Sequence, residues 1–200
     1  GISHNTSEDI SVLRSLPNLS IHNPGSRLEA EFILKSMFKS NRPSFARLGK
    51  SPEMDFYKKK INSTNDLILS KGNDLTVFTT GNILENVYKA VKNLEQDKGY
   101  KIKLISIPTL KPVNEKFIIK NINAPRVLSI EENINIGGLG SLLAMSIFKY
   151  KKNKRIHFKS LSLEDIVHNK IGSQDYLRKI NKLNIENIKK IIIKFLREKY

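Results

Sequence analysis

The 200-residue sequence contains no cysteine. This absence excludes disulfide bonds, thiolate metal ligands and a cysteine nucleophile, and it is compatible with a reducing cytoplasm, where we expect the protein to reside. The sequence also lacks an apolar run of the roughly 20 residues that a membrane-spanning helix needs. The first 15 residues have neither the basic start nor the apolar core of a signal peptide. We therefore expect a protein that does not span a membrane.

Acidic residues are scarce, because 19 Asp and Glu accompany 35 Lys and Arg and leave a formal net charge of +16. Such an excess attracts phosphates and other anions, so nucleic-acid binding is a real alternative. The lysines are, however, spread from Lys35 to Lys199, and the densest runs, 58–60 and 149–155, contain only Tyr150 as an aromatic that could stack on a base. The pattern favours a solvated basic surface over a nucleic-acid interface.

Hydrophobic periodicity, capping residues and Gly or Pro breakers predict alternating helices and strands. Thr6 is expected to cap the first helix, while Ser26 with Glu29 and Asn82 with Glu85 match the capping-box pattern. The expected helices are 6–16, 26–38, 82–94, 113–120, 137–148 and 185–196, and the expected strands are 19–22, 44–48, 75–79, 101–107, 126–130 and 155–158.

The order of these elements predicts the fold class. In the second part of the chain, strands alternate with helices, which is typical of an α/β unit with a mostly parallel sheet and right-handed crossovers. Between 49 and 73 the chain is polar, with Pro52 and three consecutive lysines, as expected of a junction. We place a first domain at 1–55 and a second at 56–200.

Several short motifs, taken in order, resemble parts of the transketolase family of thiamine diphosphate enzymes. GISH (1–4), EDI (8–10), LRSLPN (13–18), Pro24 and RPSFARLG (42–49) are similar to the second half of the family's pyrimidine-binding domain. DLTVFTTG (74–81), SIEEN (129–133) and GGLGS (137–141) are similar to its C-terminal domain. The resemblance implies a three-layer α/β/α C-terminal domain with a mostly parallel sheet, preceded by a partial α/β pyrimidine-binding domain.

The resemblance also implies a function. Such enzymes use thiamine diphosphate and Mg²⁺ to transfer a two-carbon ketol unit between phosphorylated sugars, and they assemble the site between subunits. The family's Gly-Asp-Gly…Asn cofactor motif is absent from this sequence, so we assign no cofactor-binding or metal-binding residue and expect the chain alone to be inactive. A homodimer, or a partner subunit carrying the diphosphate-binding domain, is implied.

Two residues match the family's substrate-facing positions. His4 matches the histidine that lines the substrate channel, where an imidazole can donate to a substrate oxygen or exchange a proton near neutral pH. Arg47 matches the arginine that binds the terminal phosphate of the sugar, which its planar fork of donors suits. Without the resemblance, His4 is a loop histidine that bonds locally and Arg47 is a surface residue at the end of a strand.

Other candidates favour structural interpretations. The glycine-rich turn 137–140 is neither Gly-x-Gly-x-x-Gly nor a Walker loop, so close helix packing is favoured over phosphate binding. Glu131 and Glu132 are adjacent on a strand and should point to opposite faces, which argues against a paired-carboxylate mechanism. Arg14 is expected to be structural, pairing with Glu8 or Asp9. The remaining histidines, His22, His157 and His168, lack a second ligand at metal-binding spacing.

Alternative functions stay open at this point. A deoxyxylulose-5-phosphate synthase-like enzyme, or the β subunit of a 2-oxoacid dehydrogenase, would share both domains, although Arg47 favours a phosphorylated sugar over an oxoacid. A different class is a non-catalytic basic module that binds nucleic acid or an acidic partner, with an affinity that falls steeply as salt rises.

Overall fold

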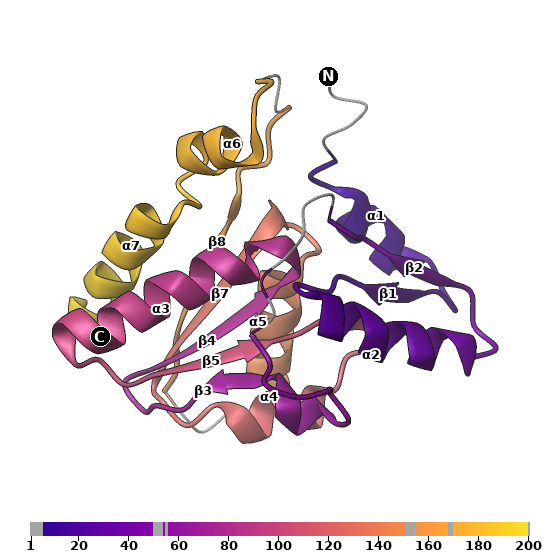
Figure 1. The fold of residues 1–200 in the computed structure, drawn as a ribbon, viewed down its shortest axis with the longest axis horizontal. Coiled ribbons are helices and arrows are strands. Elements are labelled where there is room, and N and C mark those ends of the chain that lie inside the picture. The colour runs from indigo at the N-terminus through magenta and orange to yellow at the C-terminus, as the bar shows by residue number, and fades with distance from the viewer. Residues whose placement is uncertain (1–5, 50–53, 55, 151–154, 168–169, 200) are drawn as a thin grey trace.

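The computed structural model describes residues 6–49, 54, 56–150, 155–167 and 170–199, and it forms two sheets with helices packed around them (Figure 1). His4 and His168 lie outside the described residues. The helices are α1 (Asp9–Ser15), α2 (Arg27–Phe38), α3 (Leu84–Lys98), α4 (Glu115–Asn121), α5 (Leu139–Tyr150), α6 (Gln174–Ile180) and α7 (Ile185–Arg197), with short 3-10 turns at Thr64–Leu67 and Gly81–Ile83. The strands are β1 (Ser20–His22), β2 (Ser44–Ala46), β3 (Ile68–Ser70), β4 (Leu75–Thr80), β5 (Ile102–Ser106), β6 (Thr109–Lys111), β7 (Arg126–Ile134) and β8 (His157–Leu163).

The larger sheet has five strands in the order β3-β5-β4-β7-β8. β5, β4, β7 and β8 are parallel, and β3 is an antiparallel edge. All six residues of β4 are buried, as expected of a central strand that is covered on both faces. This confirms the mostly parallel α/β fold.

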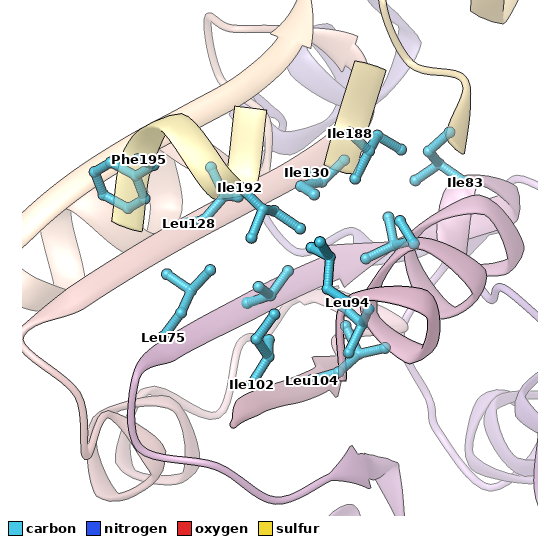
Figure 2. Close-up of a cluster of buried hydrophobic side chains, with 14 of the residues drawn as sticks. Leu75, Ile83, Leu94, Ile102, Leu104, Leu128, Ile130, Ile188, Ile192 and Phe195 are labelled. Carbon is cyan, nitrogen blue, oxygen red and sulfur yellow. The ribbon is translucent and has the colours of Figure 1, made fainter. Parts of the chain in front are cut away.

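Two apolar clusters, one on each face of this sheet, hold the layers together. Val77 faces α3 and α7, whereas its neighbour Phe78 faces α4 and α5, because successive strand side chains alternate. Figure 2 shows Ile188, Ile192 and Phe195 of α7 packed over the strands on the face of the sheet to which Val77 points. The sheet therefore lies between two helical layers.

The smaller sheet joins the two parts of the chain. β1 pairs in parallel with β2, and β6, from the second part, pairs antiparallel with β1. Ile10 and Ile21 belong to the same apolar cluster as Phe78. The two segments thus share one sheet and one cluster, and the division into domains at 1–55 and 56–200 stays a prediction.

Local capping differs from the sequence-based expectation at two helices. α1 begins at Asp9 with Glu8 as its N-cap, so the Thr6 cap is wrong by two residues. Around Asn82 the chain forms a 3-10 turn without a side-chain cap, and α3 begins only at Leu84. Ser26 does cap α2, by accepting from the Glu29 backbone N–H at 3.2 Å.

Further differences concern short or exposed elements. α6, β3 and β6 were not expected, because each has few residues in which a period could show. The expected buried strand 44–48 is observed as the shorter, half-buried edge strand β2. No helix within the described ranges is long and apolar enough to cross a membrane.

Candidate functional site

A cavity of about 500 Å³ lies where the carboxyl ends of strands from both sheets meet. Asn23 directly follows β1, Arg47 directly follows β2, and Thr80 ends β4. The backbone carbonyl of Asn23 joins these ends, because it accepts from the Gly81 N–H at 2.9 Å and from the Thr80 hydroxyl at 3.1 Å. The other wall comes from α6 and its flanking residues, and Figure 1 shows α6 and the start of α1 at the same end of the molecule.

Arg47 lines this cavity and is held by three oxygen atoms from distant parts of the chain. Its Nη1 lies 2.8 Å from Oδ1 of Asp9, and its Nη2 donates to the backbone carbonyl of Glu132 at 3.0 Å. Its Nε donates to Oδ1 of Asn23 at 3.4 Å. Each terminal nitrogen of a guanidinium carries two N–H groups, so Nη1 and Nη2 each keep one N–H that no described residue accepts. These contacts hold the guanidinium in place, and its remaining N–H groups could donate to an anion.

Glu131 and Glu132 point to opposite faces of β7, as the alternation predicted. Glu131 is buried at the start of α5, where its carboxylate accepts from the backbone N–H groups of Leu139 at 2.7 Å and Gly140 at 2.8 Å. Glu132 turns to the cavity and forms a bidentate pair with Arg178 of α6, with distances of 2.7 and 2.8 Å. Both carboxylates are engaged separately, which excludes a shared acid/base role for the pair.

Burial raises the pKa of Glu131 to about 6, against the opposing effect of the Gly140 and Leu139 N–H groups and the positive charges of Arg47 and Arg14. This carboxylate occupies the backbone donors at the start of α5 that an external phosphate would need. A Cβ atom at Gly138 would lie 2.3 Å from Glu131 Oε2. The glycine-rich turn therefore serves packing around Glu131, as the sequence favoured.

Arg14 is structural, but it contacts the turn before α5, and Asp9, one of its two expected partners, is engaged elsewhere. Its Nη1 donates to the backbone carbonyls of Gly137 and, at 2.9 Å, of Gly138. Asp9, which the sequence offered to Arg14, pairs with Arg47 instead. The reason is geometric, because the turn before α5 and Arg47 both pack beside α1, and these contacts between distant segments leave no local trace in the sequence.

Arg178 is the cavity residue that sequence reasoning missed. It is only 5% exposed, and its pair with Glu132 raises its pKa in spite of the opposing effect of burial. Its helix was not predicted, and its partner lies 46 residues away in the sequence. The only available signal was a capping residue, Ser173, before a short polar segment.

The two histidines that the structure describes, His22 and His157, each contact other side chains. His22 is buried, with Nδ1 3.0 Å from the Thr109 hydroxyl, and burial lowers its pKa. The ring of His157 packs against Phe195 with 4.8 Å between ring centroids. No group of three His, Asp or Glu side chains suited to a metal ion occurs in the described part of the chain.

A second cavity, of about 560 Å³, lies between α2, β1 and the segment 107–118. Its lining is largely apolar, with Phe32 and Met37 of α2 and Phe117 of α4, and it includes His22. Arg47 and Arg178 do not line it. We therefore place the candidate site at the first cavity, where the charged side chains converge.

The comparison with known families identifies the fold. The family model described as "Transketolase, C-terminal domain" matches residues 66–188. The chain belongs to this family. The transketolase C-terminal domain thus accounts for the five-stranded sheet and its covering helices, and the resemblance of the motifs in 74–141 is confirmed.

Individual relatives extend the likeness to nearly the whole chain. A protein described as a transketolase C-terminal section from Methanocaldococcus jannaschii is 26% identical over 99% of this chain and 62% of its own length. One of the subunits of the apulose-4-phosphate transketolase of Phocaeicola vulgatus is 26% identical over 84% of this chain and 54% of its own length. The chain therefore spans about three fifths or less of these transketolase relatives.

A solved structure shows the same fold. It is described as a split gene transketolase in the form of an inactive β4 tetramer, and it superposes with a TM-score of 0.81 at 23% identity. The match covers 98% of this chain and 63% of the other. Both parts of the present chain, including the smaller sheet, therefore follow the architecture of a transketolase chain.

Proposed function

We propose that this chain is the C-terminal part or a subunit of a thiamine diphosphate-dependent transketolase-like enzyme that transfers a two-carbon ketol unit between phosphorylated sugars. The observation that carries the proposal is Arg47. It directly follows a parallel strand, lines the cavity where strand ends from both sheets meet, and keeps on each terminal nitrogen an N–H that no described residue accepts. A cation so placed suits the terminal phosphate of a sugar.

The relatives support both the substrate class and a divided enzyme. One is named for a phosphorylated sugar and forms only part of its enzyme, and the solved relative comes from a split gene. We propose that the present chain likewise works with a partner polypeptide or in a homodimer. In the assembled site, His4 contacts the reacting oxygens of the substrate and Arg47 holds its phosphate.

Neither the sequence motifs nor the described residues of this chain fit the cofactor. The sequence lacks the Gly-Asp-Gly motif, the described residues offer no cluster for Mg²⁺, and the backbone donors at the start of α5 are taken by Glu131. We therefore assign thiamine diphosphate and Mg²⁺ to a partner polypeptide or another segment. The part played by this chain is to bind and orient the sugar phosphate.

Reconstitution tests the proposal. The chain is mixed with the polypeptide of the same organism that carries the Gly-Asp-Gly…Asn motif, together with thiamine diphosphate and Mg²⁺, and ketol transfer from a ketose phosphate to an aldose phosphate is measured. We expect activity only with both polypeptides, and we expect His4→Ala to reduce turnover without unfolding the chain. A complex that makes deoxyxylulose 5-phosphate but transfers no ketol unit would support the synthase alternative.

A further inference from the structure

The cavity contains a second arginine whose role the proposed function does not explain. Arg178 enters from α6, and its guanidinium meets the Glu132 carboxylate through Nε and Nη2. Its Nη1 has no partner among the described residues, so a donor group remains beside the cavity. Arg47 binds the backbone carbonyl of the same residue, Glu132, at 3.0 Å. Both guanidinium groups therefore bind Glu132, one through its backbone carbonyl and the other through its carboxylate, and both line the same cavity.

The position of the cavity in the sheet favours a ligand. β4 and β7 are neighbours, and the chain leaves β4 towards α3 on one face and β7 towards α5 on the other. In open α/β sheets, ligands bind at the carboxyl ends of strands where the connections diverge in this way. Thr80 and Glu132, near the ends of these two strands, both line the cavity.

A neutral donor at the same place lacks an acceptor. Asn23 is 2% exposed and lines the cavity. Its Oδ1 accepts from Arg47, but its Nδ2 has no hydrogen-bond partner within the described residues. A buried amide without an acceptor is costly, and this one lies beside Gly81 at the end of β4, next to the cavity that Asn23 lines.

The charges around the cavity specify the chemistry of that ligand. Asp9 neutralises Arg47 and Glu132 neutralises Arg178, while Lys170 also lines the wall. The remaining guanidinium N–H groups and the Asn23 amide are all donors. We infer that Arg178 is a second phosphate-binding residue, and that the cavity takes the phosphate-bearing end of a sugar phosphate between Arg47 and Arg178. The sugar part rests on the proposed function, whereas the phosphate site rests on the cavity alone.

Calorimetric titration of the full chain tests this inference. The ligands are inorganic phosphate, D-ribose 5-phosphate and D-ribose, at constant ionic strength. Because removal of Arg178 alone would leave Glu132 unpaired, the decisive variant is the charge-balanced double substitution Arg178→Gln/Glu132→Gln. Its counterpart is Arg47→Gln/Asp9→Asn. We expect each to weaken the binding of both phosphate ligands about tenfold or more, as loss of a charge-assisted contact does.

Control variants distinguish phosphate binding at this site from attraction to the overall positive charge of the chain and from loss of the fold. Lys190→Gln removes an exposed charge on α7, and we expect its phosphate affinity to stay within about twofold of the unmodified chain, since long-range charge effects are screened by salt. Arg178→Lys keeps the charge opposite Glu132 and loses the fork, so it should fold and bind phosphate several times more weakly. Circular dichroism confirms the fold of each variant.

Three results of the titrations would overturn the inference: unchanged phosphate binding in the Arg178→Gln/Glu132→Gln variant, an equal loss in Lys190→Gln, or D-ribose binding as tightly as its phosphate. The outcome is independent of the proposed function. Arg178-dependent phosphate binding by a chain that supports no ketol transfer would reject the enzyme and keep the site. Ketol transfer that depends on Arg47 but not on Arg178 would reject the site alone.

Discussion

Glu131 and Glu132 are consecutive residues of β7, yet one is part of the packing and the other belongs to a cavity. Glu131 is surrounded by its own chain and accepts from two backbone N–H groups at the start of α5. Glu132 meets a guanidinium, and its side chain keeps 24% of its exposure. The pleat of one strand thus separates a carboxylate buried in the packing from one that lines the cavity. Neighbours in sequence can therefore serve different purposes when a strand lies between two layers.

The largest expected effect on stability comes from deleting the structural carboxylate. Glu131→Ala leaves the Leu139 and Gly140 N–H groups without an acceptor in a buried place, so we expect the free energy of unfolding to fall by about 3 kcal/mol. Urea denaturation measures it. The charge-balanced variant Arg178→Gln/Glu132→Gln, which removes the ion pair without leaving either partner unpaired, should cost about 1 kcal/mol. A larger loss in that double variant than in Glu131→Ala would contradict the different roles assigned to the two carboxylates.

A smaller effect concerns the packing of α5 on the sheet. A Cβ atom at Gly140 would lie 2.3 Å from the Ser160 hydroxyl and 3.1 Å from that of Ser129. Gly140→Ala should therefore lower the free energy of unfolding by about 1–3 kcal/mol, as overpacking does. Adding Ser160→Ala, which removes the nearest atom, should recover part of the loss in thermal or urea unfolding. If the double variant recovered no stability, close packing against Ser160 would not be the reason for the glycine at position 140.

The pH dependence of stability tests whether Glu131 is buried as the structure shows. The pKa of Glu131 is raised to about 6 by burial, whereas in an unfolded chain it is about 4.3. The folded state therefore holds more protons between these values, and stability contributed by this group rises as the pH falls from 7 to 5. Relative to Glu131→Gln, the unmodified chain should gain roughly 1–2 kcal/mol over that range. If the free energy of unfolding of the unmodified chain and that of Glu131→Gln changed equally with pH, the raised pKa of Glu131 would be contradicted.

Local patterns were sufficient for the elements that bury a periodic apolar face. β4, α3 and α7 follow from their hydrophobic spacing, and the opposed directions of Glu131 and Glu132 follow from the strand period alone. The parallel sheet followed from the alternation of strands and helices. Each of these features depends on residues close together in the sequence.

The features that the sequence did not predict depend on contacts between distant residues. The pairing of Arg47 with Asp9 joins residues 38 apart, and that of Arg178 with Glu132 joins residues 46 apart. Sequence reasoning gave Asp9 to Arg14, its neighbour on the same helix, because only local partners are visible there. The role of Arg47 was suggested by family resemblance, whereas the structure supplies its cavity and the three oxygen atoms that hold it.

The central claim is that Arg47 binds the phosphate of the substrate, and a comparison of substrates tests it most directly. In the reconstituted enzyme, kcat/KM is measured for a ketose phosphate and for the same ketose without phosphate, with unmodified chain and with Arg47→Ala. We expect Arg47→Ala to lower kcat/KM about 100-fold for the phosphorylated substrate, mainly through KM, and to change it little for the unphosphorylated ketose. An equal fall for both substrates would contradict it.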